Sequence, residues 1–225
     1  MKKSKKFLTG GQVAVQTLKK EGVKHVFGLI GSATMEMFDA LYHEKKIKFI
    51  GVRDERTGTH MADGYARASN KPGVMIAGQN GPGATNLVTG IATAQMDSVP
   101  LVVITGQVPR PAIGTDAFQE TDIFGITLPI VKHSWVIRNP SDIAKVVSQA
   151  FFIASSGRPG PVLIDIPKDV GQEFFNYEQV LPGEIIPKGF KRNGEINEDD
   201  ISKAIKLIKE SKKPLLYVGG GAIAS

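Results

Sequence analysis

The sequence predicts an α/β fold: a doubly wound, mostly parallel sheet of about six strands with helices on both faces. Short β-branched apolar runs, such as 47–52 and 101–105, are typical of strands that are buried on both faces. Longer amphipathic segments alternate with these runs. The connections between them are short and rich in glycine and proline, which is the pattern of successive βαβ units.

Each element has a local reason. The first helix is expected to begin after Thr9, a residue type that caps helices, and to end near Gly22. Helices are also expected around Met35–Leu41, from the end of the second strand to about Ser69, up to about Met96, and over 141–154. Strands are expected over 23–29, 47–52, 74–77, 101–105, 131–137 and 162–166. A single sequence leaves the order of these strands open.

The alternation covers residues 1–170, which we expect to form one domain. Glycines and prolines set among charges over 171–197 predict a linker. Residues 198–225 then begin a second α/β unit, with a helix over 198–211, a strand over 215–218 and a glycine-rich turn. Because so short a unit cannot bury a core of its own, the chain is expected to be part of a longer protein.

Composition excludes several classes of function. The 225 residues contain no cysteine, which rules out disulfides, thiolate zinc sites and cysteine nucleophiles and is typical of the reducing cytoplasm. The four histidines have no metal-ligand spacing, and no apolar run approaches the roughly 18 residues of a membrane span. The net charge of +6 comes mainly from lysine-rich stretches near both ends, without interleaved aromatics. We therefore expect solvated surface there and no nucleic-acid partner.

The stretch 52–67 is the strongest candidate for a functional centre. It joins a predicted strand to a helix, and it places Glu55 at that junction. In open parallel sheets, ligands bind where the strands end. A carboxylate there can handle a proton, or it can merely suit the positive end of the helix dipole, and position alone favours the second interpretation.

Two loops are further candidates. The loop 78–86 has glycines at the mouth of a helix, which suits an anion or a ring lying against the backbone, but equally a tight turn. It lacks the lysine of a P-loop and the spacing of a dinucleotide site. The polar segment 106–120 is long for a connection within a well-patterned domain, so it is either functional or plain surface.

Several motifs together resemble the N-terminal, pyrimidine-binding domain of thiamin-diphosphate enzymes, and most closely the large catalytic subunits of acetolactate (acetohydroxyacid) synthases. The resemblance covers about Thr9 to Val170. It rests on Glu55 together with the motifs at 60–67, 81–86, 97–100, 105–109, 113–120, 132–133, 157–161 and 166–169.

The resemblance implies a role for each matching residue. Glu55 would hydrogen-bond the aminopyrimidine of the cofactor and favour the imino form, whose nitrogen removes the proton from the thiazolium carbon. Pro82 and Asn86 would contact the pyrimidine, and Gln119 would line the reaction centre. The reaction implied is the condensation of a hydroxyethyl unit from pyruvate with a second 2-oxoacid, in branched-chain amino-acid biosynthesis.

The same resemblance implies a substrate channel and further partners. Ser32, Phe118 and Lys132 would line the channel, and Arg158 would contact a structural FAD. Mg²⁺ and the diphosphate would be held by a C-terminal domain that is absent here, so no metal ligand is expected in this chain. The active site would form between two subunits of a homodimer or tetramer, to which a regulatory small subunit can add. The chain alone is therefore expected to be inactive.

Departures from the family pattern leave alternatives open. Asp54 and Arg56 flank the glutamate where the family has histidine and glutamine, and 29–32 departs from the usual Tyr-Pro-Gly-Gly turn. Together with residues 79–82, this turn resembles the corresponding residues of sulfoacetaldehyde acetyltransferase, another thiamin-diphosphate enzyme, more than those of acetolactate synthases. A second alternative is a non-catalytic, truncated binding module that dimerises through the helix carrying Gly58, Ala62 and Ala66.

Overall fold

A computed structural model describes residues 6–177, 186–187 and 196–224. The chain divides into two compact units, 1–190 and 191–225, and each is described by itself.

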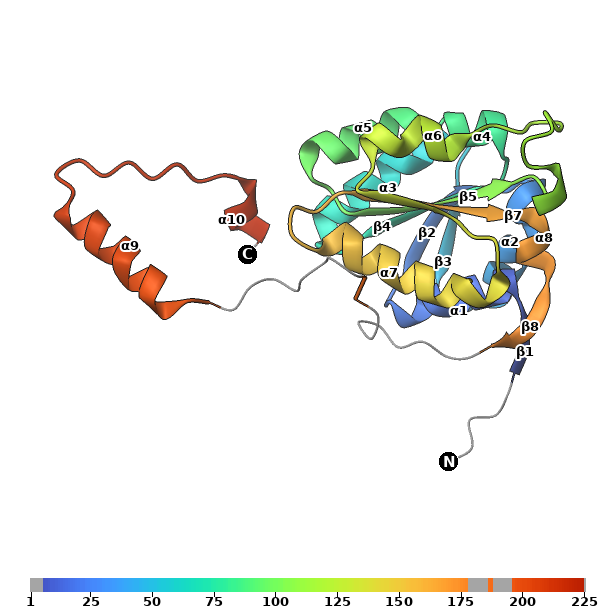
Figure 1. Ribbon diagram of the computed structural model, residues 1–225, viewed down its shortest axis with the longest axis horizontal. Coiled ribbons are helices and arrows are strands. Elements are labelled where there is room, and N and C mark those ends of the chain that lie inside the picture. Colours follow the sequence, from blue (N-terminus) through green and yellow to red (C-terminus); the bar gives the residue numbers. More distant parts are fainter. Residues whose placement is uncertain (1–5, 178–185, 188–195, 225) are drawn as a thin grey trace. The chain divides into compact units, whose positions relative to one another are not determined.

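The first unit is built on a six-stranded sheet (Figure 1). The strand order is β3-β2-β4-β5-β7-β6, and every pairing is parallel. The predicted α/β fold with about six parallel strands is confirmed. The bounds of the strands are His25–Leu29 (β2), Lys48–Gly51 (β3), Gly73–Ala77 (β4), Leu101–Gln107 (β5), His133–Val136 (β6) and Pro161–Pro167 (β7).

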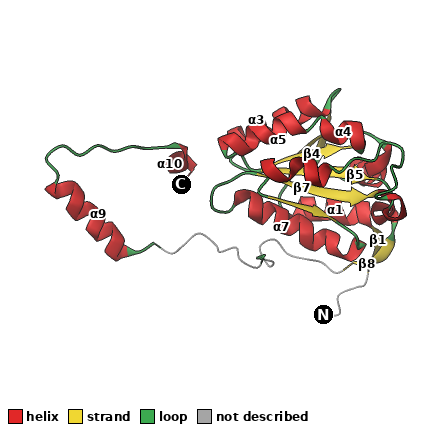
Figure 2. Ribbon diagram, turned by 45° about the horizontal axis from the view of Figure 1, so that its top comes forward, coloured by secondary structure: helices red, strands yellow, loops and turns green. Residues whose placement is uncertain are grey.

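Helices cover both faces of this sheet (Figures 1 and 2). One face carries α1, α2 and α7, and the other carries α3, α4, α5 and α6 (Figure 1). The helices span Gly10–Lys20 (α1), Met35–His43 (α2), Glu55–Ser69 (α3), Gly81–Thr85 (α4), Val88–Asp97 (α5), Ile123–Thr127 (α6), Ile143–Ser155 (α7) and Lys168–Gln172 (α8). Short 3₁₀ turns lie at Ser32–Thr34, Arg110–Ala112, Leu128–Ile130 and Pro140–Asp142.

The strands at the centre of the sheet have no polar face, because helices cover both sides. Every residue of β4, β5 and β7 is buried. Alternate residues of one strand enter opposite cores: Ile104 packs with α1 and α7, whereas Val103 packs with α3 and α5. The expected cap at Thr9 is confirmed, since its hydroxyl accepts from the backbone of Gln12 at 3.2 Å.

Some elements differ from the expectations. Residues Lys6–Thr9 (β1) pair antiparallel with Phe174–Tyr177 (β8), and α8 precedes β8, so the predicted linker over 171–197 overlaps ordered structure. Strands this short carry too few residues to show a period in the sequence. The linker residues 178–185 and 188–195 lie outside the described part of the chain.

The second unit contains Glu198–Glu210 (α9) and Gly220–Ala224 (α10). The predicted helix over 198–211 is confirmed and is capped by Asn197, whose side chain accepts from the backbone of Asp199 at 3.0 Å. The strand expected over 215–218 is wrong, because these residues form no regular secondary structure and are exposed. An apolar run forms a strand only where the chain supplies a neighbour for it.

Candidate active site

The carboxyl ends of the parallel strands meet at one edge of the sheet, and the predicted loops lie there. The loops after β2 and β4 are packed backbone against backbone: Ala33 N donates to the carbonyl of Gly78, and Gly78 N donates to that of Leu29, both at 2.9 Å. A Cβ added to Gly78 would lie 2.0 Å from the nitrogen of Gly31. Glycine is therefore required at this contact for steric reasons.

Glu55 is the first residue of α3, and its side chain is buried, with 3% exposure. Its Oε2 accepts a hydrogen bond of 3.0 Å from the amide nitrogen of Asn86, which lies between α4 and α5. A Cβ added to Gly83 would lie 2.8 Å from the other carboxylate oxygen. The carboxylate is thus held by one amide and lies directly against the backbone of Gly83, where a side chain would collide with it.

The start of α3 is capped by Asp54, the residue that departs from the family pattern. Its side chain accepts from the backbone nitrogens of Arg56 at 2.8 Å and Thr57 at 3.4 Å. The helix therefore has its cap in Asp54, and it does not need the Glu55 carboxylate for that purpose.

The loop that carries Gln119 lies against the glycine loop. Gln119 has a φ of 62°, and a Cβ added to Gly81 would lie 2.3 Å from its carbonyl oxygen. Glu120 closes the loop, because its carboxylate accepts from the backbone of Gly114 and, at 3.1 Å, from that of Ala117. The structure thereby brings the segments of Glu55, Pro82, Asn86 and Gln119 together.

The predicted channel residues are divided between two edges of the sheet. Ser32 follows β2 on the same edge as Glu55 and is exposed, and Phe118, in the Gln119 loop, is 87% exposed. Lys132, however, precedes β6 and therefore lies at the amino edge. Its ammonium donates to the carbonyls of Ile153 and of Ser156, the latter at 2.7 Å, at the end of α7. Burial lowers the pKa of Lys132.

Arg158 lies at the amino edge as well, just before β7. Its Nε donates to Ser98 at 2.7 Å, and its Nη2 donates to the carbonyl of Met96 at 3.1 Å, so it binds the end of α5. Within this chain Lys132 and Arg158 are helix-terminating cations, and neither is brought to Glu55. The sequence reasoning passed over Lys168, which directly follows β7 at the carboxyl edge. The end of the buried run 162–166 was the signal for it.

A second buried carboxylate lies below this edge. Asp165 in β7 is 1% exposed, and it accepts from the Thr105 hydroxyl at 2.7 Å and from the Gln107 amide at 3.1 Å. Burial raises the pKa of Asp165 to about 6, although both of these hydrogen bonds act to lower it. Asp165 lies inside an apolar run, whose pattern predicts a buried strand and not a buried carboxylate.

Asp165 is expected to make stability depend on pH. Because the folded state holds this proton more tightly than the unfolded chain, whose value is near 3.8, its contribution to stability is greatest below that value and is lost as the pH rises through about 6. Relative to Asp165→Asn, the wild type should lose roughly 3 kcal/mol of unfolding free energy between pH 4 and pH 7.5. Urea denaturation of both proteins at several pH values measures this difference.

Glu21, whose pKa burial also raises, affects wild type and variant equally and cancels in the difference. A difference between the two proteins that stays constant with pH would contradict the prediction.

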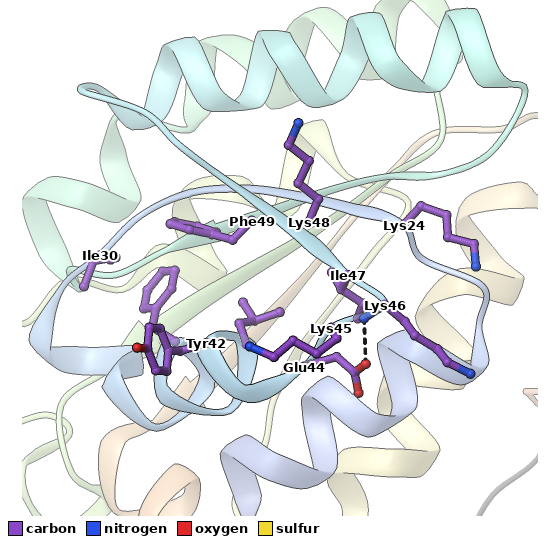
Figure 3. A pocket seen from close by; sticks show the side chains of 11 residues that line it. Lys24, Ile30, Tyr42, Glu44, Lys45, Lys46, Ile47, Lys48 and Phe49 are labelled. Carbon is purple, nitrogen blue, oxygen red and sulfur yellow. Dashed lines mark hydrogen bonds between the residues drawn. The ribbon is translucent and has the colours of Figure 1, made fainter.

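A pocket beside the edge strand β3 is a weaker candidate. It has a volume of about 500 Å³, and its apolar wall includes Phe38 and Phe49. Four lysines, at positions 24, 45, 46 and 48, line it, but Figure 3 shows their side chains pointing in different directions. Glu44, also in its lining, binds Lys19 at 2.7 Å. The lysines do not converge on a point where an anion would be bound.

Metal and membrane features can be assessed over the described residues. There, no cluster of three or more His, Asp or Glu side chains is arranged to hold a metal ion. Over the same residues, no helix has both the length and the apolar character that crossing a membrane requires.

Comparison with known proteins agrees with this geometry. Residues 8–126 match the family model described as thiamine pyrophosphate enzyme, N-terminal TPP binding domain. The chain belongs to this family. Among its relatives, the acetolactate synthase large subunit of Parasynechococcus marenigrum is 61% identical over 221 residues, which cover 97% of this chain and 36% of the relative.

Other relatives extend the comparison. The acetolactate synthase of Arthrospira platensis is 53% identical over 99% of this chain and 39% of the relative. The large subunit of the Haemophilus influenzae enzyme is 46% identical over 98% of this chain and 38% of the relative. This member of the thiamine pyrophosphate enzyme family therefore spans less than two fifths of the length of these relatives.

The residues at the carboxyl edge fit the pyrimidine ring of thiamine pyrophosphate. Such a ring needs a buried carboxyl group beside a ring nitrogen and an acceptor for its amino group. Glu55 supplies the first. The Oε1 of Gln79 is buried and has no hydrogen-bond partner among the described residues, so it is an acceptor that still lacks a donor. The Cβ of Gln79 and the Oε1 of Glu55 would lie 2.6 and 2.8 Å from a Cβ added to Gly83, so both side chains lie against the backbone of this glycine.

Proposed function

We propose that this chain is the pyrimidine-binding part of a thiamin-diphosphate-dependent acetolactate synthase. The complete enzyme would condense the two-carbon unit of pyruvate with a second 2-oxoacid in branched-chain amino-acid biosynthesis. One observation carries the proposal: a buried Glu55 carboxylate, bound to Asn86 at 3.0 Å, faces bare backbone at the carboxyl edge of the sheet. The names of the relatives support the choice of reaction.

Each residue has a distinct task in this proposal. Glu55 holds a proton at the ring nitrogen, and its burial keeps water from competing for that proton. Asn86 fixes the carboxylate by its hydrogen bond, and Pro82 contributes an apolar surface for the ring. When bound, thiamin diphosphate supplies the nucleophilic carbon for the 2-oxoacid. Gln119, beside Gly81, would face the reacting groups.

The substrate would enter past exposed side chains of this edge. Ser32 and Phe118 are the candidates, and their exposure at this edge supports the proposal. Phe118, which is 87% exposed, would be covered by a second subunit of a homodimer or tetramer. Lys168 replaces Lys132 as the proposed channel lysine, because it lies at the carboxyl edge.

Further groups enter only through the resemblance. Mg²⁺ would be bound by residues outside this chain, and a regulatory small subunit is a partner suggested by the term "large subunit" in the relatives' names. FAD would be contacted by Arg158, whose Nε and Nη2 bind Ser98, Gln95 and Met96 within this chain. A cytoplasmic location accords with the lack of cysteine.

The test joins this chain to the remainder of the Parasynechococcus marenigrum relative, which is 61% identical over the shared part. With thiamin diphosphate and Mg²⁺, the fusion is expected to convert pyruvate to acetolactate. The acetolactate is decarboxylated to acetoin in acid, and the acetoin is measured colorimetrically. The isolated chain is the control and is expected to be inactive. Activity with sulfoacetaldehyde and phosphate in place of pyruvate would favour the acetyltransferase alternative. A folded, cofactor-saturated fusion without either activity would support the non-catalytic module.

A further inference from the structure

The loop 108–122 is anchored at its start to α8 and the residue after it, and at its end to Gln107 of β5, which in turn binds Asp165 of β7. At its start, Arg110 binds Asp169 at 2.7 Å and Glu173 at 2.7 Å. At its end, the carbonyl of Thr121 accepts a hydrogen bond of 3.1 Å from the side-chain amide of Gln107. The first anchor is partly exposed. In the second, which we call the interior anchor, the side chains of Gln107 and Asp165 are buried and Thr121 is half-buried.

The interior anchor has only one arrangement that satisfies all of its polar atoms. Nε2 of Gln107 donates one proton to Thr121 and the other to Oδ2 of Asp165 at 3.1 Å. Oε1 of Gln107 accepts from the backbone of Val108 at 2.8 Å. Asp165, the Thr121 carbonyl and the Val108 N–H therefore favour the same orientation of the Gln107 amide, because a reversed amide would place oxygen against both the Asp165 carboxylate and the Thr121 carbonyl.

This anchor bears directly on the glycine loop. A Cβ added to Gly81 would lie 2.3 Å from the carbonyl oxygen of Gln119 and 3.1 Å from the hydroxyl of Thr121. The end of the loop thus rests on the backbone beside Glu55 and Asn86. A displacement of Thr121 would move Gln119 with it, since only Glu120 separates the two.

We propose that Asp165 is a positioning residue that acts through Gln107 to hold the end of the 108–122 loop, and hence Gln119, against the glycine loop. The side chain of Asp165 is 1% exposed and has no ion pair among the described residues, so burying its charge costs folding free energy. This cost is explained if Asp165 helps to fix the orientation of the Gln107 amide, both of whose N–H groups donate hydrogen bonds. The importance of Gln119 rests on the proposed function, but the position of the loop does not.

Hydrogen exchange of the 225-residue chain at pH 7 tests the proposal. Asp165→Ala is expected to speed the exchange of the amides of Glu120 and Ile123 by about tenfold, the effect of losing one hydrogen bond to a charged group. Amides in β4 should exchange as in the wild type after correction for global stability. Asp165→Asn should restore the loop, because its amide oxygen can accept from Gln107 while its nitrogen donates to Thr105.

A matched variant at the other anchor makes the test local. Asp169→Ala removes the partner of Arg110, and it is expected to affect the amides of Ala112 and Ile113 while sparing Glu120 and Ile123. If Asp165→Ala does not fold, Gln107→Met removes the same link and should give the same local pattern. In the double variant the two effects should not add.

The proposal is overturned if Asp165→Ala or Gln107→Met raises the amide exchange rates by the same factor throughout the first unit. It is also overturned if the exchange rates of Glu120 and Ile123 remain as in the wild type. Neither result would count against the proposed function, because the exchange measurement is made on the isolated chain without cofactor. Conversely, if the fusion enzyme were inactive, the local exchange pattern would still be evidence for the interior anchor.

Discussion

Glu55→Gln is expected to lower acetolactate formation by the fusion enzyme by at least about a hundredfold, the range for loss of a positioned acid–base group. The glutamine is similar in size and can still bind Asn86, but it cannot exchange a proton with a ring nitrogen. The effect should appear in kcat at saturating cofactor, with thiamin diphosphate binding measured separately by fluorescence quenching.

Asp54→Asn is the matched control for this change. Asparagine caps helices as well as aspartate does, so the start of α3 should be preserved and activity should stay close to that of the wild type. If both variants lost activity equally, the role of Glu55 would reduce to helix formation. An active Glu55→Gln enzyme would remove the main support for the proposed function.

Gly78→Ala is expected to destabilise the isolated chain by about 3 kcal/mol or more, because overpacking against backbone cannot be relieved by a side-chain rotation. The new Cβ would lie 2.0 Å from the nitrogen of Gly31 and 2.3 Å from the carbonyl oxygen of Leu29. The loops after β2 and β4 would have to separate, which would also disturb the edge where Glu55 lies. Urea denaturation followed by circular dichroism measures the change.

Gly64→Ala provides the opposite expectation in the same protein. Gly64 lies within α3, is exposed, and has open space where a Cβ would be added. Alanine there should stabilise the chain by about 0.5–1 kcal/mol through helix propensity. Similar losses of stability at both glycines would show that steric contact at Gly78 is not the cause.

Local patterns were sufficient for much of the fold. The β-branched runs at 74–77 and 101–105 became β4 and β5, because a strand buried on both faces needs an uninterrupted apolar sequence. The same reasoning failed at 215–218, where no neighbour pairs with the run in the described structure. It also missed β1 and β8, which are defined by pairing with each other across most of the first unit.

The candidate site shows the same division. Position after an apolar run singled out Glu55, and the glycine spacing singled out the loop 78–86. The expectation that the strand before Glu55 is buried on both faces is wrong, because β3 lies at the edge of the sheet and is only partly buried. The roles implied for Lys132 and Arg158 stay predictions, and the structure adds that both residues precede strands and so lie at the amino edge. Whether a residue comes before or after its strand decides which edge of a parallel sheet it can reach.

The sequence by itself determined the class of fold and the carboxylate at the junction of β3 and α3, since both depend on periods and junctions that are local in the chain. Only the tertiary structure decided that Asn86 binds Glu55 across 31 positions and that Asp165 turns the amide of Gln107 across 58. Such contacts depend on strand order and on the packing of backbone at glycines. Neither is encoded in any single stretch of residues.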